Sequence, residues 1–346
     1  MSWKRFFCCV FVIINVVSGK LVAQDDSDST KKELLKSVQE WFLHQQDTNY
    51  ILNYNNEISL RVLGVSKYNY FKMVDRNTDS KITYYPDAKV SFGAGITYRW
   101  FSLDVTFNSG LNERKAESST AFDFQAKIFS PKQYFELTYK YYYGYIIGDS
   151  KNLTSEIPDS VNIRGDIRTS FFGLDFMYAF NYGRFSVKAP FVYNEIQKKS
   201  AGSFVIGAGL ASYILDGDSD ILPESAKPDF NPNLYFSSLN TINLSINGGY
   251  MYTLVFLRKF YLTLSAVPGI VLVAGDYKIE DREFLDLRAS IKFSTMNSLG
   301  YNSRRFYTGV HFGNSFYLTK ISEKDGIQVG YMKLKLFAGF RLRKKE

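Results

Sequence analysis

The chain contains very little cysteine, histidine or tryptophan. Two cysteines, two histidines and three tryptophans occur among 346 residues. Both cysteines, Cys8 and Cys9, lie in an N-terminal stretch that we expect to be removed, so the remaining chain has no thiol. This excludes disulfide bonds, thiolate metal sites and a cysteine nucleophile from the mature protein.

Long apolar runs are also lacking. Beyond the N-terminus, no run approaches the ~20 residues of a membrane-spanning helix. Lys4 and Arg5, followed by the apolar residues 6–17 and the small residue Ala23, are typical of a secretory signal peptide that is cleaved before Gln24. Its removal lowers the net charge from +8 to +5, and no nucleic-acid partner is predicted.

The chain is rich in aromatic residues and in segments in which polar and apolar residues alternate. It contains 26 Tyr and 30 Phe. In residues 328–342, Leu334 and Leu336 fall on one face of an extended strand, and Lys333 and Lys335 fall on the other. About a dozen segments alternate in this way, which indicates an all-β protein, an antiparallel transmembrane β-barrel. A soluble protein of β-sandwiches is the alternative.

The predicted organisation has three parts. These are a signal peptide (1–23), a periplasmic N-terminal segment with a short amphipathic helix (24–55) and an outer-membrane β-barrel (56–346). Strands are expected at 56–71, 88–99, 101–109, 119–130, 133–147, 163–181, 184–215, 240–257, 259–275, 284–299, 304–319 and 328–342. Tight turns are expected at 99–100, 131–132, 182–183, 258–259 and 300–303, between long polar loops.

Short periplasmic turns and long external loops are typical of outer-membrane barrels, so the expected location is the outer membrane of a Gram-negative bacterium. The expected partners are outer-membrane lipid, lipopolysaccharide and the barrel assembly machinery. Residues 184–215 are too long for one crossing. Counted as two strands, they would give 13 and place the later short turns outside. We interpret them as one crossing with a bulge or protruding extension, which gives 12 strands, and 14 is the second choice.

The predicted inner face is rich in charge. The candidate lumen-lining residues are Arg61, Lys127, Lys140, Asp175, Asp286, Arg288, Lys292, His311, Lys333, Lys335 and Arg341. Their basic excess favours a narrow passive pore for small anionic solutes. The alternative is a closed structural or adhesive barrel that acts through its external loops.

A lipid-modifying enzyme is a third hypothesis, and the chain is not expected to be an enzyme. His311 is the candidate residue, but Ser315 lies ~13 Å along the same strand, too far for a hydrogen bond. No cofactor is predicted.

Two acidic loops superficially resemble calcium loops. Their alternate oxygen-bearing residues are Asp75, Asn77, Asp79, Asp216, Asp218 and Asp220. Position six holds Ser80 or Ile221 instead of glycine, which favours ordinary polar loops over metal sites.

An aromatic run lies within the fifth expected strand, 133–147. Alternation places Tyr139, Tyr141, Tyr143 and Tyr145 on the outer face, as an interface girdle.

Three motifs resemble a known family. They are Asp47-Thr48-Asn49-Tyr50-Ile51, the stretch at 198–204 (Lys-Lys-Ser-Ala-Gly-Ser-Phe) and the stretch at 248–253 (Gly-Gly-Tyr-Met-Tyr-Thr). The chain resembles a family of Gram-negative outer-membrane barrels that is classified as a domain of unknown function. The resemblance implies an outer-membrane location and no catalytic residues.

Overall fold

A computed structural model describes residues 46–86, 90–108, 120–154, 157–158, 162–279, 282–320 and 324–342. The predicted signal peptide, the N-terminal helix and His44 lie outside the described residues. Within these residues, no helix combines the length and hydropathy that are needed to cross a membrane.

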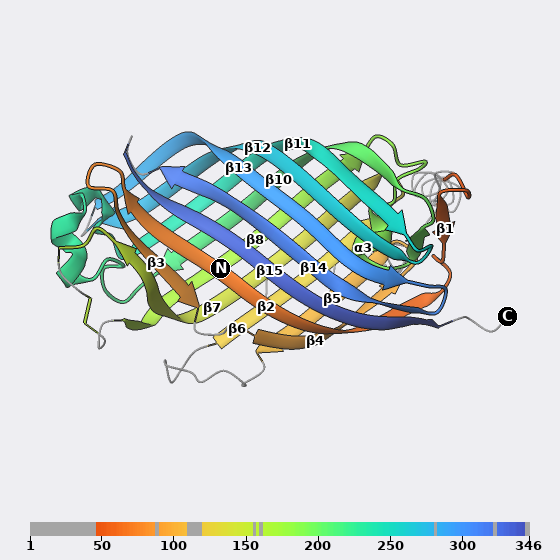
Figure 1. Ribbon diagram of the computed structural model, residues 1–346. Helices are drawn as coiled ribbons and strands as arrows, with labels where there is room; N and C mark the ends of the chain where they lie inside the picture. Colours follow the sequence, from red (N-terminus) through yellow and green to blue (C-terminus); the bar gives the residue numbers. More distant parts are fainter. Residues whose placement is uncertain are drawn as a thin grey trace, which may run out of the picture. The chain divides into compact units, whose positions relative to one another are not determined.

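Twelve antiparallel strands close into a ring (Figure 1). In order around the ring they are β2 (Ile58–Asp75), β4 (Val90–Tyr98), β5 (Phe101–Asn108), β6 (Thr120–Phe129), β7 (Gln133–Lys151), β8 (Ile163–Ala179), β10 (Ala201–Asp216), β11 (Ser238–Phe256), β12 (Phe260–Ile279), β13 (Arg282–Asn302), β14 (Phe306–Lys320) and β15 (Asp325–Leu342). The pairing of β15 with β2 along their whole length leaves no open edge. The predicted fold class and strand number are confirmed.

The remaining elements lie at the two ends of the ring. β3 (Ser80–Pro86) bridges β2 and β7 at the end with the long loops, near η1 (Glu224–Asp229) and η2 (Pro232–Leu234). At the short-turn end, β1 (Ile51–Asn53) pairs with β9 (Glu195–Gln197), close to α3 (Lys188–Phe191).

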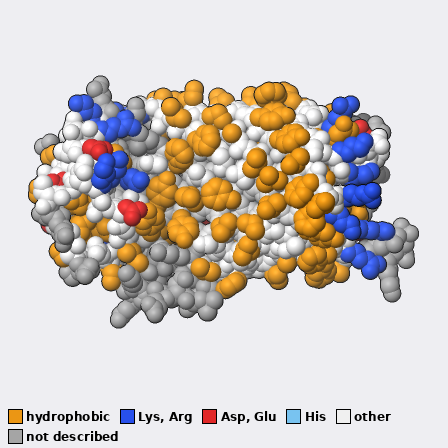
Figure 2. Space-filling model, in the orientation of Figure 1, with side chains coloured by type: hydrophobic (Ala, Val, Ile, Leu, Met, Phe, Trp, Pro, Cys, Tyr) orange, Lys and Arg blue, Asp and Glu red, His pale blue; other side chains and the backbone are white. Residues whose placement is uncertain are grey.

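Side chains alternate between an apolar outside and a polar or aromatic inside. On β15, Lys333 and Lys335 are buried, whereas Leu334 and Leu336 are exposed. Exposed apolar side chains cover the middle of the barrel, while charged side chains stay near its ends (Figure 2). An outer face of this kind suits lipid, and the closed ladder satisfies the backbone polar groups.

The prediction for Tyr145 is wrong. Its ring points into the barrel, where it is 2% exposed and contacts Phe71, and its hydroxyl bonds to Thr169. The register shifts between Tyr143 and Tyr145, because Gly144 has a φ of 86° and inserts a bulge. The extra residue of the bulge changes which residues of β7 point into the barrel: those after Gly144 lie on the opposite face from the one that strict alternation predicts.

Gly144→Ala should therefore destabilise the barrel. The left-handed conformation costs an L-residue about 1–2 kcal/mol, and we expect a loss of this size in the free energy of unfolding, measured by urea titration in vesicles. Gly165→Ala is the control, since a Cβ at that position meets no atom within 4 Å. Equal losses in the two variants would contradict this explanation of the bulge.

Candidate functional site

The connection between β8 and β10 folds into the barrel and closes its short-turn end. Every residue from Phe185 to Gln197 is buried, and we call this segment the plug. The turn predicted at 182–183 is present within residues 180–184, but it leads into the plug and not directly into the next strand. The protruding extension is wrong, because residues 185–197 lie inside the barrel and the crossing begins at Ala201. The sequence pattern of the plug resembles a strand, but its apolar side chains pack against the inner wall.

Apolar and aromatic contacts hold the plug on several sides. Phe185, Val187 and Phe191 belong to one cluster with residues of β6, β7, β8, β10, β11 and β12. The Tyr193 ring stacks on Phe337 at 4.3 Å and on Tyr307 at 4.8 Å between ring centroids. Because these contacts reach strands all around the ring, the plug fills this end of the lumen.

Polar groups fix the plug in one position. Arg341 donates hydrogen bonds to the Tyr193 carbonyl at 2.7 Å and to Asn302 Oδ1 at 2.7 Å. Within the plug, Lys188 and Glu195 form a buried ion pair at 3.4 Å. The predicted lumen residue Arg341 thus anchors the plug.

The long-loop end is covered by residues 217–237, which we call the cap (left in Figure 1). Ile221, Leu234 and Phe236 are fully buried against inner residues such as Phe71 and Tyr84. The Tyr84 hydroxyl and Arg164 donate hydrogen bonds to the Ile221 carbonyl at 2.7 and 2.8 Å. Both ends of the lumen are therefore occupied by the chain itself.

An ion-pair network crosses one side of the lumen. Asp104 accepts hydrogen bonds from Arg61 at 2.8 Å and from Lys335 at 3.2 Å. Asp123 pairs with Lys67 and accepts from the Tyr142 hydroxyl at 2.7 Å. These bridges join β2 and β15 to β5 and β6.

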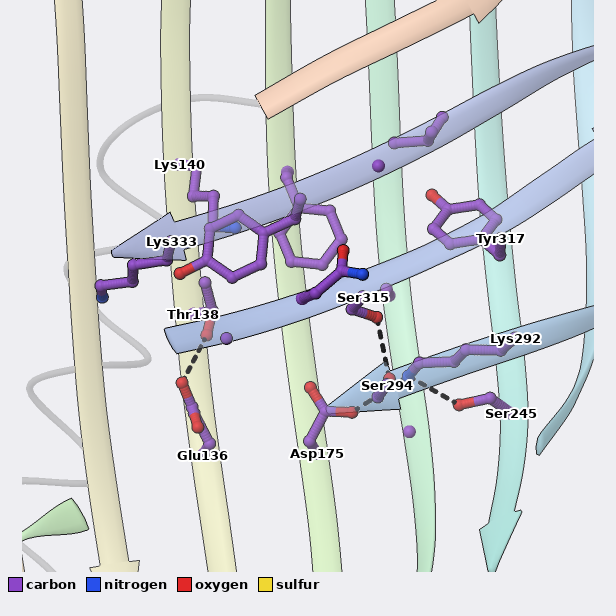
Figure 3. A pocket seen from close by; sticks show the side chains of 18 of the residues that line it. Glu136, Thr138, Lys140, Asp175, Ser245, Lys292, Ser294, Ser315, Tyr317 and Lys333 are labelled. Carbon is purple, nitrogen blue, oxygen red and sulfur yellow. Dashed lines mark hydrogen bonds and ion pairs between the residues drawn. The ribbon is translucent and has the colours of Figure 1, made fainter. Parts of the chain in front are cut away.

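A cavity of about 270 Å³ lies between the plug and the cap. His311, which contacts Phe191 of the plug, lines one part of it. Tyr145 and Tyr213, which belong to the cluster under the cap, line another. Its wall combines tyrosines and lysines with asparagine and serine side chains (Figure 3).

Two lysines of this cavity have no carboxylate partner among the described residues. The Lys140 ammonium lies 3.2 Å from the centroid of the Tyr331 ring, and Lys333 donates to Gln125 at 2.9 Å. Both are buried, and Figure 3 shows them at one side of the cavity. A buried charge without a counter-ion is costly, so the cavity is suited to an anion.

The wall also holds polar atoms without a partner. The Oδ1 atoms of Asn243, Asn247 and Asn314 and the Nδ1 atom of His311 are buried, and no described residue bonds to them. All four residues line the cavity. The three amide oxygens accept hydrogen bonds from hydroxyl or amide groups when a ligand or water supplies them, and the His311 Nδ1 accepts or donates according to its tautomer.

A family model for a domain of unknown function, DUF4421, matches residues 45–342. The chain belongs to this family. The predicted resemblance is confirmed, and no curated protein matches the sequence.

Solved structures with a similar fold are outer-membrane proteins. The protease OmpT from Escherichia coli has 7% identity and a TM-score of 0.38, with 84% of this chain and 98% of that chain covered. The translocator domain of the autotransporter NalP from Neisseria meningitidis has 11% identity and a TM-score of 0.35, with coverages of 90% and 95%. These values describe a distant similarity of fold alone.

The other predicted lumen residues of this DUF4421 barrel take different places. Lys127 pairs with Glu136 at 3.4 Å, and Lys292 pairs with Asp175 at 3.5 Å, with all four lining the cavity. Arg288 lies on β13 away from the cavity lining, and the Asp286 side chain lies outside the described residues. The alternation from Arg61 also reaches Lys67, a lumen residue that the prediction left out.

His311 has no described catalytic partner. Its ring packs edge-on against Phe191, with 5.2 Å between centroids, and its Nδ1 accepts no hydrogen bond from the described residues. Ser315 bonds to Ser294 at 2.9 Å instead. A histidine base is normally oriented by a second group, which this arrangement does not provide.

The acidic loops use their carboxylates for other contacts. Asp75 accepts hydrogen bonds from the backbone of Asn77 and Asn231, and Asp216 bonds to Ser238. Asp220 pairs with Lys227. The described residues contain no group of three acids, histidines or cysteines arranged to hold a metal ion.

Asp79 is the exposed member of these loops. Lys151 donates a hydrogen bond to it at 2.8 Å, which holds the pKa of its carboxylate below the ordinary value. Its interactions therefore favour the ionised form and join the β2–β3 turn to the end of β7.

Proposed function

We propose that the protein is an outer-membrane barrel that is closed at rest and binds a small anionic solute in its lumen. Passage of the solute then requires the plug to move. The short-turn end faces the periplasm and the cap faces the outside. The apolar outer face, the predicted signal peptide and the rhythm of short and long connections support this location.

The cavity lysines carry the proposal. Neither Lys140 nor Lys333 forms an ion pair with a described carboxylate, whereas the neighbouring Lys335 shares Asp104 with Arg61. A barrel with a purely structural role would gain stability from apolar residues at these positions. A lumen that retains cations next to unpartnered acceptors has the chemistry of a site for a hydroxylated carboxylate or phosphate.

Titration calorimetry of the refolded protein with small hydroxycarboxylates and sugar phosphates tests this proposal. We expect saturable binding that weakens about tenfold or more in Lys140→Gln and in Lys333→Gln, since a hydrogen bond to a charged group contributes ~1.5–3 kcal/mol. Lys151→Gln, at the long-loop end, is the matched control and leaves binding unchanged. Binding that survives both cavity substitutions would contradict the assignment.

A closed barrel that acts through its external surface is the second candidate. The close packing of Ile221, Leu234 and Phe236 under the cap supports it, because a rigid cap can present a fixed surface. The same titrations separate the two functions: no binding of any anion, in a protein that is folded, would favour the external surface.

A further inference from the structure

The short turns of the barrel carry a row of exposed basic side chains. Arg99 lies in the β4–β5 turn, and Lys199 lies at the end of the plug connection. Arg258 and Lys259 form the β11–β12 turn, and Arg304 and Arg305 form the β13–β14 turn. All six are exposed, and we call them the basic collar.

The collar residues form no ion pair within the part of the chain that the structure describes. Among the described residues, none of its six members lies within ion-pairing distance of a carboxylate; Arg99 and Lys259 lie over the rings of Tyr98 and Tyr301 instead. Glu195, a nearby acid, is fully buried and paired with Lys188. The positive charge of the collar is therefore available to a partner.

The opposite end of the barrel differs in this respect. There Asp79 pairs with Lys81 and Lys151, and Lys227 pairs with Asp220. In Figure 2 acidic and basic side chains mingle at that end, whereas basic side chains dominate the other. The asymmetry is a property of the turns and loops, since the strands between them present apolar residues to the outside.

The collar lies directly beside the lipid-facing surface. Leu257 and Phe260 flank Arg258 and Lys259, and Phe306 follows Arg305; all three apolar side chains are exposed. Lysine and arginine next to such a surface extend toward the lipid head groups while their stems remain on apolar neighbours. The phosphates of the surrounding leaflet are therefore within the reach of the collar.

We propose that the collar binds the anionic head groups of phospholipids in the leaflet at the short-turn end. This goes beyond the solute site and rests only on the membrane location. A net negative head group, such as that of phosphatidylglycerol, offers each basic side chain an unshared phosphate. A zwitterionic head group offers a phosphate that its own ammonium already neutralises. The collar thereby selects the charge of its lipid neighbours.

Trp100 is a reporter for this interaction, because it follows Arg99 in the same turn. The chain from Gln24 with Trp41→Phe has Trp100 as its single tryptophan. In mixed vesicles, spin-labelled phosphatidylglycerol and spin-labelled phosphatidylcholine are compared as quenchers of its fluorescence. We expect an association constant about fivefold or more higher for the anionic lipid, the factor that one basic residue near a membrane contributes.

Lowering the charge of the collar should weaken this preference. Arg99→Gln/Arg304→Gln/Arg305→Gln removes three of its six charges and lowers the ratio of the two association constants, and Arg304→Gln/Arg305→Gln, which alters a single exposed turn, gives a smaller loss in the same direction. Arg76→Gln/Lys81→Gln/Lys151→Gln, at the other end, is the matched control and keeps the preference. Equal quenching by both lipids in the protein with the unaltered collar, or a ratio of association constants that the triple collar variant leaves unchanged, would overturn the proposal.

Discussion

Replacement of residues 185–197 by a short glycine–serine turn is expected to convert an electrically silent barrel into a conducting one. The plug packs against side chains from strands on all sides, and the hydrogen bond from Arg341 to the Tyr193 carbonyl fixes it at the short-turn end. Its removal leaves a twelve-stranded ring, which is wider than the eight-stranded barrels that side chains alone can fill. Conductance across a planar bilayer measures the change.

The open form should prefer anions. Lys333 and Lys335 line the cavity that removal of the plug opens at the short-turn end, and basic side chains that line a pore favour anions. Lys198→Ser/Lys199→Ser is the matched control, because it alters the exposed end of the same connection and leaves the plug in place. A plugless barrel that folds, as judged by its altered migration on a gel before boiling, yet stays silent would show that the cap closes the lumen by itself.

Asp104→Ala is expected to cost about 3–5 kcal/mol in the free energy of unfolding. Asp104 is 7% exposed and accepts hydrogen bonds from two cationic side chains, Arg61 and Lys335. These two residues are 4% and 3% exposed. Removing the carboxylate leaves both charges buried without an ion-pair partner, and the penalty for this exceeds the strength of the lost bonds. Urea unfolding of the barrel in vesicles measures the loss.

Two further variants isolate the cause of this loss. Asp104→Asn keeps the side-chain shape but removes the charge, so it should lose nearly as much stability as Asp104→Ala. Asp79→Ala breaks exposed ion pairs with Lys81 and Lys151 and should change stability by less than about 1 kcal/mol. Similar losses at Asp79 and Asp104 would show that burial of the network contributes nothing.

The strand pattern alone was sufficient to predict the barrel. Alternation in segments such as Lys333 to Leu336 determines which face meets lipid, because successive side chains of a strand point to opposite faces. The alternation of short and long connections then indicated an even number of strands, with both termini of the chain on the same side of the membrane. Both signals are local and follow from strand geometry, so the fold and the inner position of the lysines could be predicted without a structure.

The sequence could not indicate which residues depart from the alternating strand pattern. Residues 185–197 alternate like a strand, but they lie inside the ring because Tyr193, Phe191 and Arg341 meet partners far away in the chain. Tyr145 faces inward because one glycine in the left-handed conformation shifts the register.

The sequence by itself determined the class of the protein, its strands and the charge of its inner face. The tertiary structure alone decided which charges pair and where the lumen is closed. Lys333 meets Gln125 across 208 positions of sequence, and Lys335 meets Asp104 across 231. Such contacts depend on how far the strands are staggered when the ring closes, which no local pattern of residues encodes.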